Sequence, residues 1–561
     1  MQLLKTHNTP LTLLKVPRAL YVLTFCLVII CFHLFFYTGH FGFDDMGYAQ
    51  YAFELSQGNL QLLDDHYAYR LGVLWPTAIA YILFGVNDGA SAIMPILASF
   101  TILFLVNDML KKEKVITALL AMAMLTFTFW NLHYSDKLMP DIWVSFGVTI
   151  ACYALYRQYF DPPKWKIILP ILMAIGIFYA FLSKEIVLFT LPAFAIFWLK
   201  DIFKKQHITF WLTTIGLGIL VFGVYFLHQY ISTGNALARI AAIKSGTYYS
   251  PTCSYAELPL ENLIKRIIYL PFAHVGGDSG FAIPCVLAIS AFIFVAARII
   301  KNQRIAFFST LFFALFVGAF WMSASLSAYS PICIDPRHFL FLLPMASIAA
   351  SMLVINFFNN KKVAVATCIV FLIISIACVV NKVTFRESTI VFTIGLIVYT
   401  LAKHFKNRFI NTAAVGIMLI ALVVSPAIII KSFNSPNQYK IVKQHTYDLI
   451  NNATENTFIV TTQVQENIGN YLNEFGNKNP KVQFVSYKPF DANHYRYLGK
   501  SLFKVERILI FNNRHTQNLS GKNANDMPKY FFEPIANGKV LLNENGTFIQ
   551  EVKSIKDLTW E

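Results

Sequence analysis

Residues 20–49 read LYVLTFCLVIICFHLFFYTGHFGFDDMGYA, an apolar run from Leu20 to Tyr37 followed closely by two adjacent acids. The run is long enough to cross a bilayer as one helix, and it lacks the small-residue cleavage site of a signal peptide. Asp44 and Asp45 then lie just outside the membrane, where a carboxylate is costly and is usually retained for chemistry or ion handling. The alternative is a helix cap, because aspartate there accepts free backbone N–H groups.

The remaining composition is that of a polytopic membrane protein. Of the 561 residues, 56% are hydrophobic and 14% are charged, and apolar runs of about 20 residues recur as far as residue 430. The net charge of +16 is dispersed among the loops between these runs, where positive charge sets topology. A nucleic-acid partner is therefore not expected.

Basic clusters order the spans, because Lys and Arg accumulate on the cytoplasmic side. All clusters face the cytoplasm if segment 71–85, which contains Pro76, lies on the outer surface as an interfacial helix. About thirteen spans then run from a cytoplasmic N-terminus to an external C-terminus. The predicted spans are 19–37, 88–109, 115–133, 139–157, 167–183, 185–199, 208–230, 281–299, 305–325, 339–358, 363–381, 388–402 and 409–430.

The chain divides at residue 430, after which long apolar runs stop. Residues 431–561 contain three predicted strands, at 457–461, 481–487 and 507–511, and a predicted helix at 465–475. The fold class is therefore an all-α polytopic membrane protein with a small extracytoplasmic α/β domain. The transmembrane module, residues 1–430, carries four outer loops, at 38–87, 133–141, 231–280 and 327–338.

The outer loops bring acids and cations to one side of the membrane. A carboxylate can take a proton from an acceptor hydroxyl or amine, and Arg or Lys can neutralise a departing phosphate. The loops are therefore suited to transferring a group from a lipid phosphate to an acceptor. The candidate residues are Asp44, Asp45, Tyr48, Arg70, Asp141, Lys184, Glu185, Arg337 and His338.

These motifs resemble those of the GT-C glycosyltransferases that use polyprenyl-phosphate sugars, which include the protein O-mannosyltransferases and the lipid A aminoarabinose transferase. The segment from Asp44 to Ala49 is similar to their Asp-Glu or Asp-Asp-x-x-Tyr-Ala motif after the first span. Residues 58–85 are similar to their two juxtamembrane helices. Met139-Pro-Asp141 resembles the acid of their second outer loop, and Pro336-Arg337-His338 resembles a Pro-Arg-Tyr element before a late span.

The resemblance implies inverting transfer at the extracytoplasmic face of the cell (inner) membrane. The donor would be a polyprenyl-phosphate-linked sugar, and the acceptor a protein, lipid or envelope glycan. Asp44 would be the general base, with Asp45 and Asp141 as further catalytic acids and the other candidates around the substrates. No cofactor or metal is expected, although some members of the group use a divalent cation. The chain departs from the family at Asp45, Arg70 and His338, where many members have Glu, Lys and Tyr.

Each assignment has a simpler alternative. Asp141 could cap its span, Lys184 and Glu185 could form an interfacial ion pair, and Arg337 could be a membrane anchor whose head reaches water. For the whole protein, the alternative is a transporter or flippase of lipid-linked envelope intermediates. That alternative needs charges inside the spans, whereas the acids here cluster in the outer loops.

Histidines and cysteines add one further expectation. His66, His133 and His274 lack metal-ligand spacing and are expected to be solvated. The eight cysteines contain no CxxC pair. Cys253 and Cys333 fall in two outer loops, on the oxidising side, where a disulfide is chemically allowed; two free thiols are the alternative.

Overall fold

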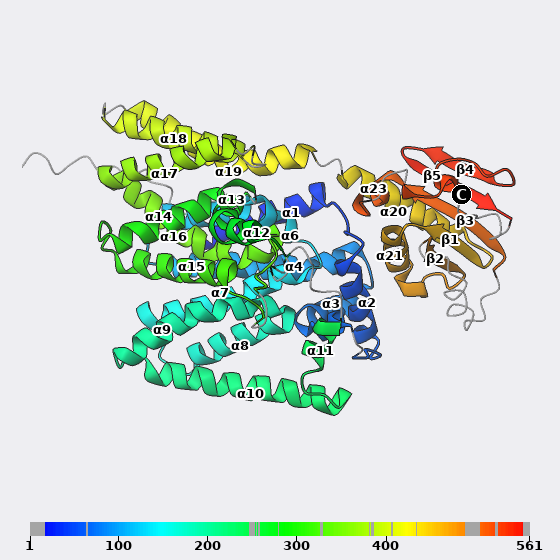
Figure 1. Ribbon diagram of the computed structural model, residues 1–561, viewed down its shortest axis with the longest axis horizontal. Helices are drawn as coiled ribbons and strands as arrows, with labels where there is room; N and C mark the ends of the chain where they lie inside the picture. Colours follow the sequence, from blue (N-terminus) through cyan, green and yellow to red (C-terminus); the bar gives the residue numbers. More distant parts are fainter. Residues whose placement is uncertain are drawn as a thin grey trace, which may run out of the picture.

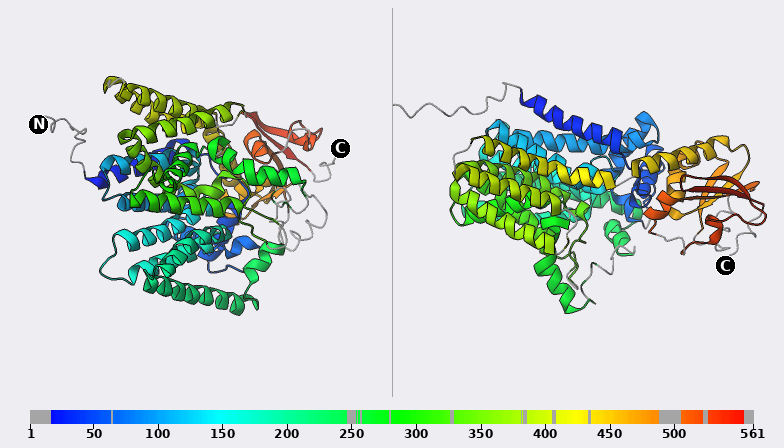
Figure 2. Two further views of the ribbon diagram at one scale, coloured as in Figure 1. Left: turned by 60° about the vertical axis from the view of Figure 1, so that its left-hand side comes forward. Right: turned by 90° about the horizontal axis from the view of Figure 1, so that it is seen from above.

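The computed structural model describes residues 17–62, 65–245, 253, 255, 258–278, 280–325, 329–380, 382, 386–404, 408–432, 435–487, 505–521 and 526–553. A bundle of helices carries a smaller α/β unit at one end (Figure 1). The two further views confirm that this unit lies beyond the ends of the bundle helices (Figure 2).

The bundle contains the following helices in chain order: α1 (Arg18–Phe36), α2 (Asp44–Ser56), η1 (His66–Tyr69), α3 (Leu71–Phe84), α4 (Asp88–Met109), α5 (Val115–Phe127), α6 (Phe129–Tyr134), α7 (Pro140–Phe160), α8 (Ile168–Ser183), η2 (Glu185–Thr190), α9 (Leu191–Phe203), α10 (Ile208–Thr233), α11 (Ala238–Ser245), α12 (Leu260–Ile264), η4 (Lys265–Tyr269), α13 (Leu270–Ala273), η5 (His274–Asp278), α14 (Ala282–Ala296), α15 (Gln303–Trp321), η6 (Pro336–Leu342), α16 (Leu343–Asn359), α17 (Lys361–Val380), α18 (Arg386–His404) and α19 (Arg408–Ser432).

The helices confirm the polytopic membrane class. Seven helices of the described part are long and apolar enough to cross a membrane, and five shorter apolar helices accompany them. Large apolar side chains point outward, such as Leu212, Ile219 and Leu220 of α10, which are 60% or more exposed. Such surfaces suit lipid, in which a helix satisfies all its own backbone groups. Each predicted span coincides with one helix or with two consecutive helices, but helix length and composition do not establish thirteen crossings.

The segment around Pro76 forms helix α3, which packs against α2. Both helices lie at the end of the bundle that carries the α/β unit (Figure 1). Trp75, Ile79 and Leu83 are more than 40% exposed, whereas Val73 and Leu74 are fully buried. One side of α3 is thus covered by protein and the other is apolar and open, the pattern expected of an interfacial helix.

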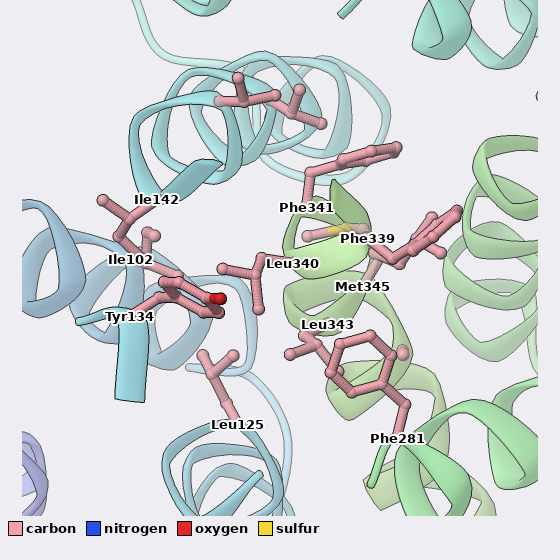
Figure 3. Close-up of a cluster of buried hydrophobic side chains, with 14 of the residues drawn as sticks. Ile102, Leu125, Tyr134, Ile142, Phe281, Phe339, Leu340, Phe341, Leu343 and Met345 are labelled. Atoms are coloured by element: carbon pink, nitrogen blue, oxygen red, sulfur yellow. The ribbon is translucent and has the colours of Figure 1, made fainter. Parts of the chain in front are cut away.

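The core of the bundle surrounds η6 and the start of α16 (Figure 3). Phe339, Leu340 and Phe341 of η6 are at most 2% exposed. The ring of Phe339 stacks on that of Phe320 in α15, with centroids 4.3 Å apart. Because close packing holds helices together in a membrane, these contacts fix η6 and with it Arg337 in the first turn.

The C-terminal unit is a five-stranded sheet in the order β2-β1-β3-β5-β4. Strands β1, β2 and β3 are parallel, whereas β5 runs antiparallel to β3 and β4. The three predicted strands and the predicted helix all form. The elements are α20 (Ser435–Asn452), β1 (Thr457–Thr461), α21 (Gln463–Leu472), η7 (Glu474–Gly476), β2 (Val482–Ser486), β3 (Arg507–Asn513), α23 (Arg514–Leu519), η9 (Lys529–Phe531), β4 (Lys539–Glu544) and β5 (Thr547–Val552).

The hairpin of β4 and β5 was not predicted from the sequence. Its turn is Asn545-Gly546, and both residues have positive φ, of 51° and 72°. An Asn-Gly pair between two strands is a strong signal for a two-residue hairpin, so this hairpin could have been found. Strand β4 is largely exposed, and its apolar run, Val540–Leu542, is only three residues long, shorter than the runs of four to eight residues that mark a strand.

Candidate active site

Asp44 begins helix α2 at the end of the bundle nearest the α/β unit. The Tyr67 hydroxyl donates a hydrogen bond to its Oδ1 at 2.7 Å, and Nη1 of Arg337 lies 3.5 Å from its Oδ2. The side chain is 35% exposed, and the first turn of a helix favours negative charge. The carboxylate is therefore held by two partners and remains accessible.

Asp45 has different surroundings, although it is the next residue. It is 1% exposed and accepts hydrogen bonds from the backbone N–H groups of Phe41 at 2.6 Å and Phe43 at 3.0 Å. Its Oδ2 lies 3.4 Å from Nδ1 of His40. These bonds close the turn between α1 and α2. The position of Asp45 thus suits holding this turn, and the position of Asp44 suits meeting a substrate.

A cavity of about 310 Å³ opens beside Asp44. Its polar wall combines Asp44 with Lys184, Glu185, Arg337 and His338, which come from three separate segments of the chain. Much of the remaining wall is apolar, including Ile186, Phe189, Ile243, Pro331 and Ile332. A carboxylate and two cations therefore face one space, an arrangement that proton removal and phosphate binding together would require.

Asp141 lies behind this wall and holds Lys184. The Lys184 ammonium donates a hydrogen bond to Oδ1 of Asp141 at 2.8 Å, and both side chains are at least 95% buried. Asp141 is the second residue of α7, whose cap position is Met139. The capping interpretation of Asp141 is therefore wrong. A buried carboxylate paired this closely positions the cation rather than contacting solvent.

Glu185 pairs with two arginines, whereas Lys184 pairs with Asp141. Arg239 lies 2.6 Å and Arg70 3.4 Å from its carboxylate. Arg70 also donates a hydrogen bond to the Tyr48 hydroxyl. Arg70 and Tyr48 are at most 1% exposed, and neither lines the cavity. Arg70 therefore holds Glu185 in position, and Tyr48 holds Arg70, but neither of these two predicted site residues faces the cavity.

Cys253 and Cys333 form a disulfide, with Cα atoms 5.3 Å apart, and both line the cavity. The bridge joins the loop after α11 to the segment that carries Arg337. Nδ1 of His338 lies 3.2 Å from the carbonyl oxygen of Cys333. Because the bridge closes a sequence separation of 80 residues, it restricts the unfolded chain strongly and fixes this wall of the cavity.

A larger apolar groove, of about 980 Å³, lies between the loop that precedes α3 and helices α8 and α10. Tyr225 and Gln229 of α10 belong to its wall. Nη1 of Arg239 donates a hydrogen bond to the Tyr225 hydroxyl at 3.4 Å, and the backbone N–H of Arg239 donates one to Oε1 of Gln229 at 3.3 Å. Because the partner of Arg239 is Glu185, the Arg239–Glu185 ion pair lies between this part of the groove wall and the cavity wall.

The expectation that three histidines are solvated is wrong. His66, His133 and His274 are 9%, 6% and 3% exposed. Burial, assisted by the nearby charge of Arg70, lowers the pKa of His66 to about 4. Within the described ranges, no group of three or more His, Cys, Asp or Glu side chains is placed to hold a metal ion.

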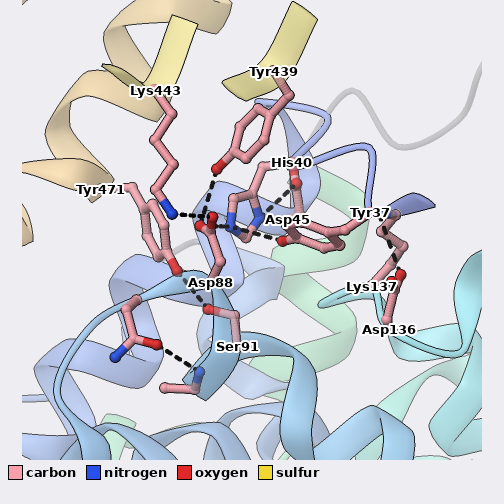
Figure 4. Close-up of polar contacts among 12 residues, drawn as sticks. Tyr37, His40, Asp45, Asp88, Ser91, Asp136, Lys137, Tyr439, Lys443 and Tyr471 are labelled. Atoms are coloured by element: carbon pink, nitrogen blue, oxygen red, sulfur yellow. Dashed lines mark hydrogen bonds and ion pairs between the residues drawn. The ribbon is translucent and has the colours of Figure 1, made fainter. Parts of the chain in front are cut away.

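The α/β unit docks on the turn between α1 and α2 through a polar network (Figure 4). Asp88, at the start of α4, accepts hydrogen bonds from the Tyr439 hydroxyl at 2.9 Å and the Lys443 ammonium at 2.7 Å. His40 lies between Asp88 and Asp45, at 3.3 and 3.4 Å. The network thus links the C-terminal unit to the residue beside Asp44.

Two glycines allow this close approach. Gly39 and Gly42 both have positive φ, of 77° and 80°, which other residues adopt only with strain. A Cβ atom at Gly39 would collide with the ring of Tyr439, and one at Gly42 would lie 2.6 Å from a methyl group of Val464. The sequence Thr38-Gly-His40-Phe-Gly42 is therefore shaped for contact with the C-terminal unit.

Sequence reasoning missed the contact partners that lie far from the site residues along the chain. Tyr67, Arg239 and Asp88 each complete an interaction of a predicted site residue or its neighbour, but none stands in a recognisable motif. The sequence separations are large, for example 54 residues between Arg239 and Glu185. The only local signal was the pair of glycines around His40, which indicates a constrained turn.

We expect replacement of Asp88 by Asn to loosen the C-terminal unit. The amide removes the charge that Lys443 and His40 face, and breaking such a buried pair costs about 3 kcal/mol. The melting temperature of the purified protein in detergent should fall. Asp108→Asn, at the opposite end of α4 where Asp108 pairs with Arg157, is the matched control and should change stability by less than about 1 kcal/mol.

The same network makes stability depend on pH. Burial alone would lower the pKa of His40, but the carboxylates of Asp45 and Asp88 raise it above the ordinary value of 6.5. The stabilisation from protonated His40 is therefore complete below pH 6.5 and is lost as the pH rises through the higher folded-state pKa. In Asp88→Asn this loss should become smaller; an unchanged pH profile would contradict the assignment.

No protein-family model matches the chain, and no curated protein matches it in sequence. Solved structures do match. ArnT from Cupriavidus metallidurans in the apo state aligns with a TM-score of 0.53 and 10% identity, over 95% of this chain and 98% of that chain. The same protein bound to undecaprenyl phosphate aligns with a TM-score of 0.52 and 11% identity, over 95% and 97%.

The oligosaccharyltransferase of Archaeoglobus fulgidus in the apo form also matches, with a TM-score of 0.48 and 11% identity, over 95% of this chain and 74% of that chain. At such low identities the likeness to ArnT establishes the fold and nothing further. The chain has the fold of the GT-C glycosyltransferases, and the resemblance stated from its sequence motifs is confirmed at this level.

Proposed function

We propose that this protein is a membrane glycosyltransferase of GT-C type that transfers a sugar from a polyprenyl-phosphate carrier with inversion. The observation that carries the proposal is the cavity wall on which Asp44 meets Arg337 and Lys184. The carboxylate is accessible, and the two cations are held by Asp335 and Asp141 respectively, at 3.1 and 2.8 Å. Acid and cations are therefore in place before any substrate binds.

In the proposed step, Asp44 takes the proton of an acceptor hydroxyl or amine as that group attacks the anomeric carbon. The new glycosidic bond forms while the bond from this carbon to the phosphate oxygen breaks. The electron pair leaves with polyprenyl phosphate, whose charge Arg337 and Lys184 stabilise. One displacement on the face opposite the leaving group inverts the anomeric configuration.

The apolar groove supports a lipid-linked donor. It is open to the side of the bundle between α8 and α10, and Leu220, Val224 and Trp75 contribute to its wall. An isoprenoid chain can lie there with its phosphate directed past the Arg239–Glu185 pair towards the cavity. ArnT, which has the same fold, was crystallised with undecaprenyl phosphate. This makes undecaprenyl phosphate the first carrier to test.

The proposed site faces the extracytoplasmic side of the cell (inner) membrane. The basic clusters, which belong on the cytoplasmic side, include Lys111, Lys112 and Lys114 at the end of α4. Asp44 lies at the opposite end of the bundle, near the start of α4, where the α/β unit docks (Figure 1). The acceptor, a protein, lipid or envelope glycan, would then approach from outside the cell.

Donor turnover tests the proposal directly. The purified protein is given a panel of undecaprenyl-phosphate-linked sugars with an envelope extract as acceptor source, and release of undecaprenyl phosphate is measured. We expect one donor to be consumed and the product to have the inverted anomeric configuration by NMR. The matching nucleotide sugars, which lack the lipid, should not be consumed. Consumption of none of the lipid-linked donors, or retention of configuration, would contradict the proposal.

A further inference from the structure

A polar cleft of about 620 Å³ lies between α2 and the α/β unit. One side is formed by α2 and η1 of the bundle, and the other by α21, η7 and the edge strand β2. The docking network at Asp88 holds these two sides together. The cleft is thus a space that neither part of the chain forms alone.

Side-chain amides dominate the cleft. Asn467, Asn470 and Asn473 are spaced by three residues on or just beyond α21, so they share one helix face. Asn467 and Asn473 bind backbone carbonyl groups, at 2.8 and 3.0 Å. The side chain of Asn470 has no hydrogen-bond partner among the described residues, and Oε1 of Gln483 is buried without one.

Unpaired amides of this kind indicate a ligand that both donates and accepts hydrogen bonds. An amide offers two N–H donors and a carbonyl acceptor, and a buried polar atom without a partner is costly. Neighbouring hydroxyl groups of a sugar ring match this arrangement. Tyr51, Tyr67 and Phe475 also line the cleft, and aromatic faces can cover the apolar face of such a ring.

The charge of the cleft excludes an anionic ligand. No Lys, Arg or His belongs to its wall as described, and the one charged residue is Asp65. Its carboxylate already accepts hydrogen bonds from the Tyr51 hydroxyl at 2.9 Å and from the backbone N–H of Tyr67 at 3.0 Å. A phosphate-bearing acceptor would require the Arg and Lys residues that are absent from this wall.

The wall of the cleft adjoins Asp44, which itself lines the cavity. Phe43 and Tyr67 line the cleft; Phe43 directly precedes Asp44, and the Tyr67 hydroxyl lies 2.7 Å from its Oδ1. The other carboxylate oxygen faces Arg337 in the cavity. Asp44 therefore stands between the cleft and the cavity, where a base must lie if the acceptor enters from one side and the donor from the other.

We propose that this cleft binds the acceptor, and that the acceptor is an uncharged oligosaccharide presenting free hydroxyl groups. The inference rests on the proposed function and narrows its acceptor from any protein, lipid or glycan to a neutral glycan. Binding in the cleft requires neither the donor nor the chemical step, so it can be measured apart from transfer.

The experiment uses the full-length Asp44→Asn protein in detergent, so that no turnover interferes. Neutral tetrasaccharides of hexoses and N-acetylhexosamines are the probes, with an uncharged Ser- and Thr-containing octapeptide and purified lipid A as competing classes. Saturation-transfer NMR measures binding. We expect at least one tetrasaccharide to bind. Adding the two substitutions Asn470→Ala and Gln483→Ala to the Asp44→Asn protein should weaken tetrasaccharide binding about tenfold, as the loss of two hydrogen bonds predicts.

Matched controls are Asn451→Ala and Gln463→Ala, which remove exposed amides of the same unit outside the cleft. They should leave binding unchanged. Three results would overturn the inference. The first is that no tetrasaccharide binds, and the second is that the control pair weakens binding as much as the cleft pair does. The third is that the octapeptide or lipid A binds and loses this binding in the Asn470 and Gln483 variant. Donor consumption by the native protein would stand in any of these cases, so failure of the inference differs from failure of the proposed function.

Discussion

Replacing Asp44 by Asn should reduce sugar transfer by about 10²- to 10⁴-fold, the contribution expected of a general base. The amide has nearly the same shape and can still accept the hydrogen bond from the Tyr67 hydroxyl, but it cannot take a proton. The side chain is one third exposed, so the melting temperature should stay close to that of the native protein. The measurement is initial transfer rate at saturating donor together with thermal unfolding.

Two variants separate chemistry from structure. Glu54→Gln removes a carboxylate from the far end of α2, where it contacts the Gln50 amide, and should leave both rate and stability unchanged. Asp45→Asn removes the charge beside buried His40 and should lower the melting temperature. Near-native turnover in Asp44→Asn would rule out the assignment of Asp44 as base, and lost stability in that variant would assign it to the turn instead.

Replacing Arg337 by Ala should weaken donor binding about ten- to hundredfold, because a hydrogen bond to a charged group contributes about 1.5–3 kcal/mol. The Arg337 side chain lines the cavity and is 20% exposed, and its Nε lies 3.1 Å from Asp335. It is therefore held in position and still able to reach a phosphate. The dissociation constant for undecaprenyl phosphate in detergent is the measurement.

Arg337→Lys should recover only part of the affinity, since an ammonium cannot bind phosphate through two parallel N–H groups. Arg304→Ala is the matched control. Arg304 pairs with Glu113 at the start of α15, whereas the other end of α15 packs against η6, which carries Arg337. The donor affinity of this control should be native. An Arg337→Ala protein that binds the lipid phosphate normally would show that the arginine serves only to hold Asp44 and Asp335.

The sequence was sufficient for the class of protein. Each predicted span is helical, as one helix or two consecutive helices, because a long apolar run in lipid has one stable form, in which every backbone group is satisfied within the segment. Strands 457–461, 481–487 and 507–511 were equally predictable, since short β-branched runs bury their side chains in a sheet. The hairpin of β4 and β5 was missed although β5 is buried. The apolar runs of its two strands, Val540–Leu542 and Phe548-Ile549, are shorter than those that mark a strand.

The sequence also indicated which loops carry the chemistry. Asp44, Lys184, Arg337 and His338 were selected from three separate segments predicted on the outer side, and the structure places all four on one cavity wall. Spans of alternating direction bring their outer loops to one side of the membrane, so topology alone limited where these residues could meet. Arg70 and Tyr48, chosen by the same reasoning, are instead buried behind Glu185.

The family resemblance named Asp44 as the base, but only the tertiary structure gives the physical reason why Asp44 lines the cavity and Asp45 is buried. Neighbouring residues of a helix point about 100° apart, and nothing local determines which of the two faces the cavity. That is decided by partners far along the chain, Arg337 for Asp44 and His40 with Asp88 for Asp45. Asp88 is in turn held by Lys443, 355 residues away. A charge can be buried only where folding supplies its counter-charge. The sequence could therefore select residues that meet at the cavity, but it could not predict the distant partners that hold them, such as Asp88 and Arg239.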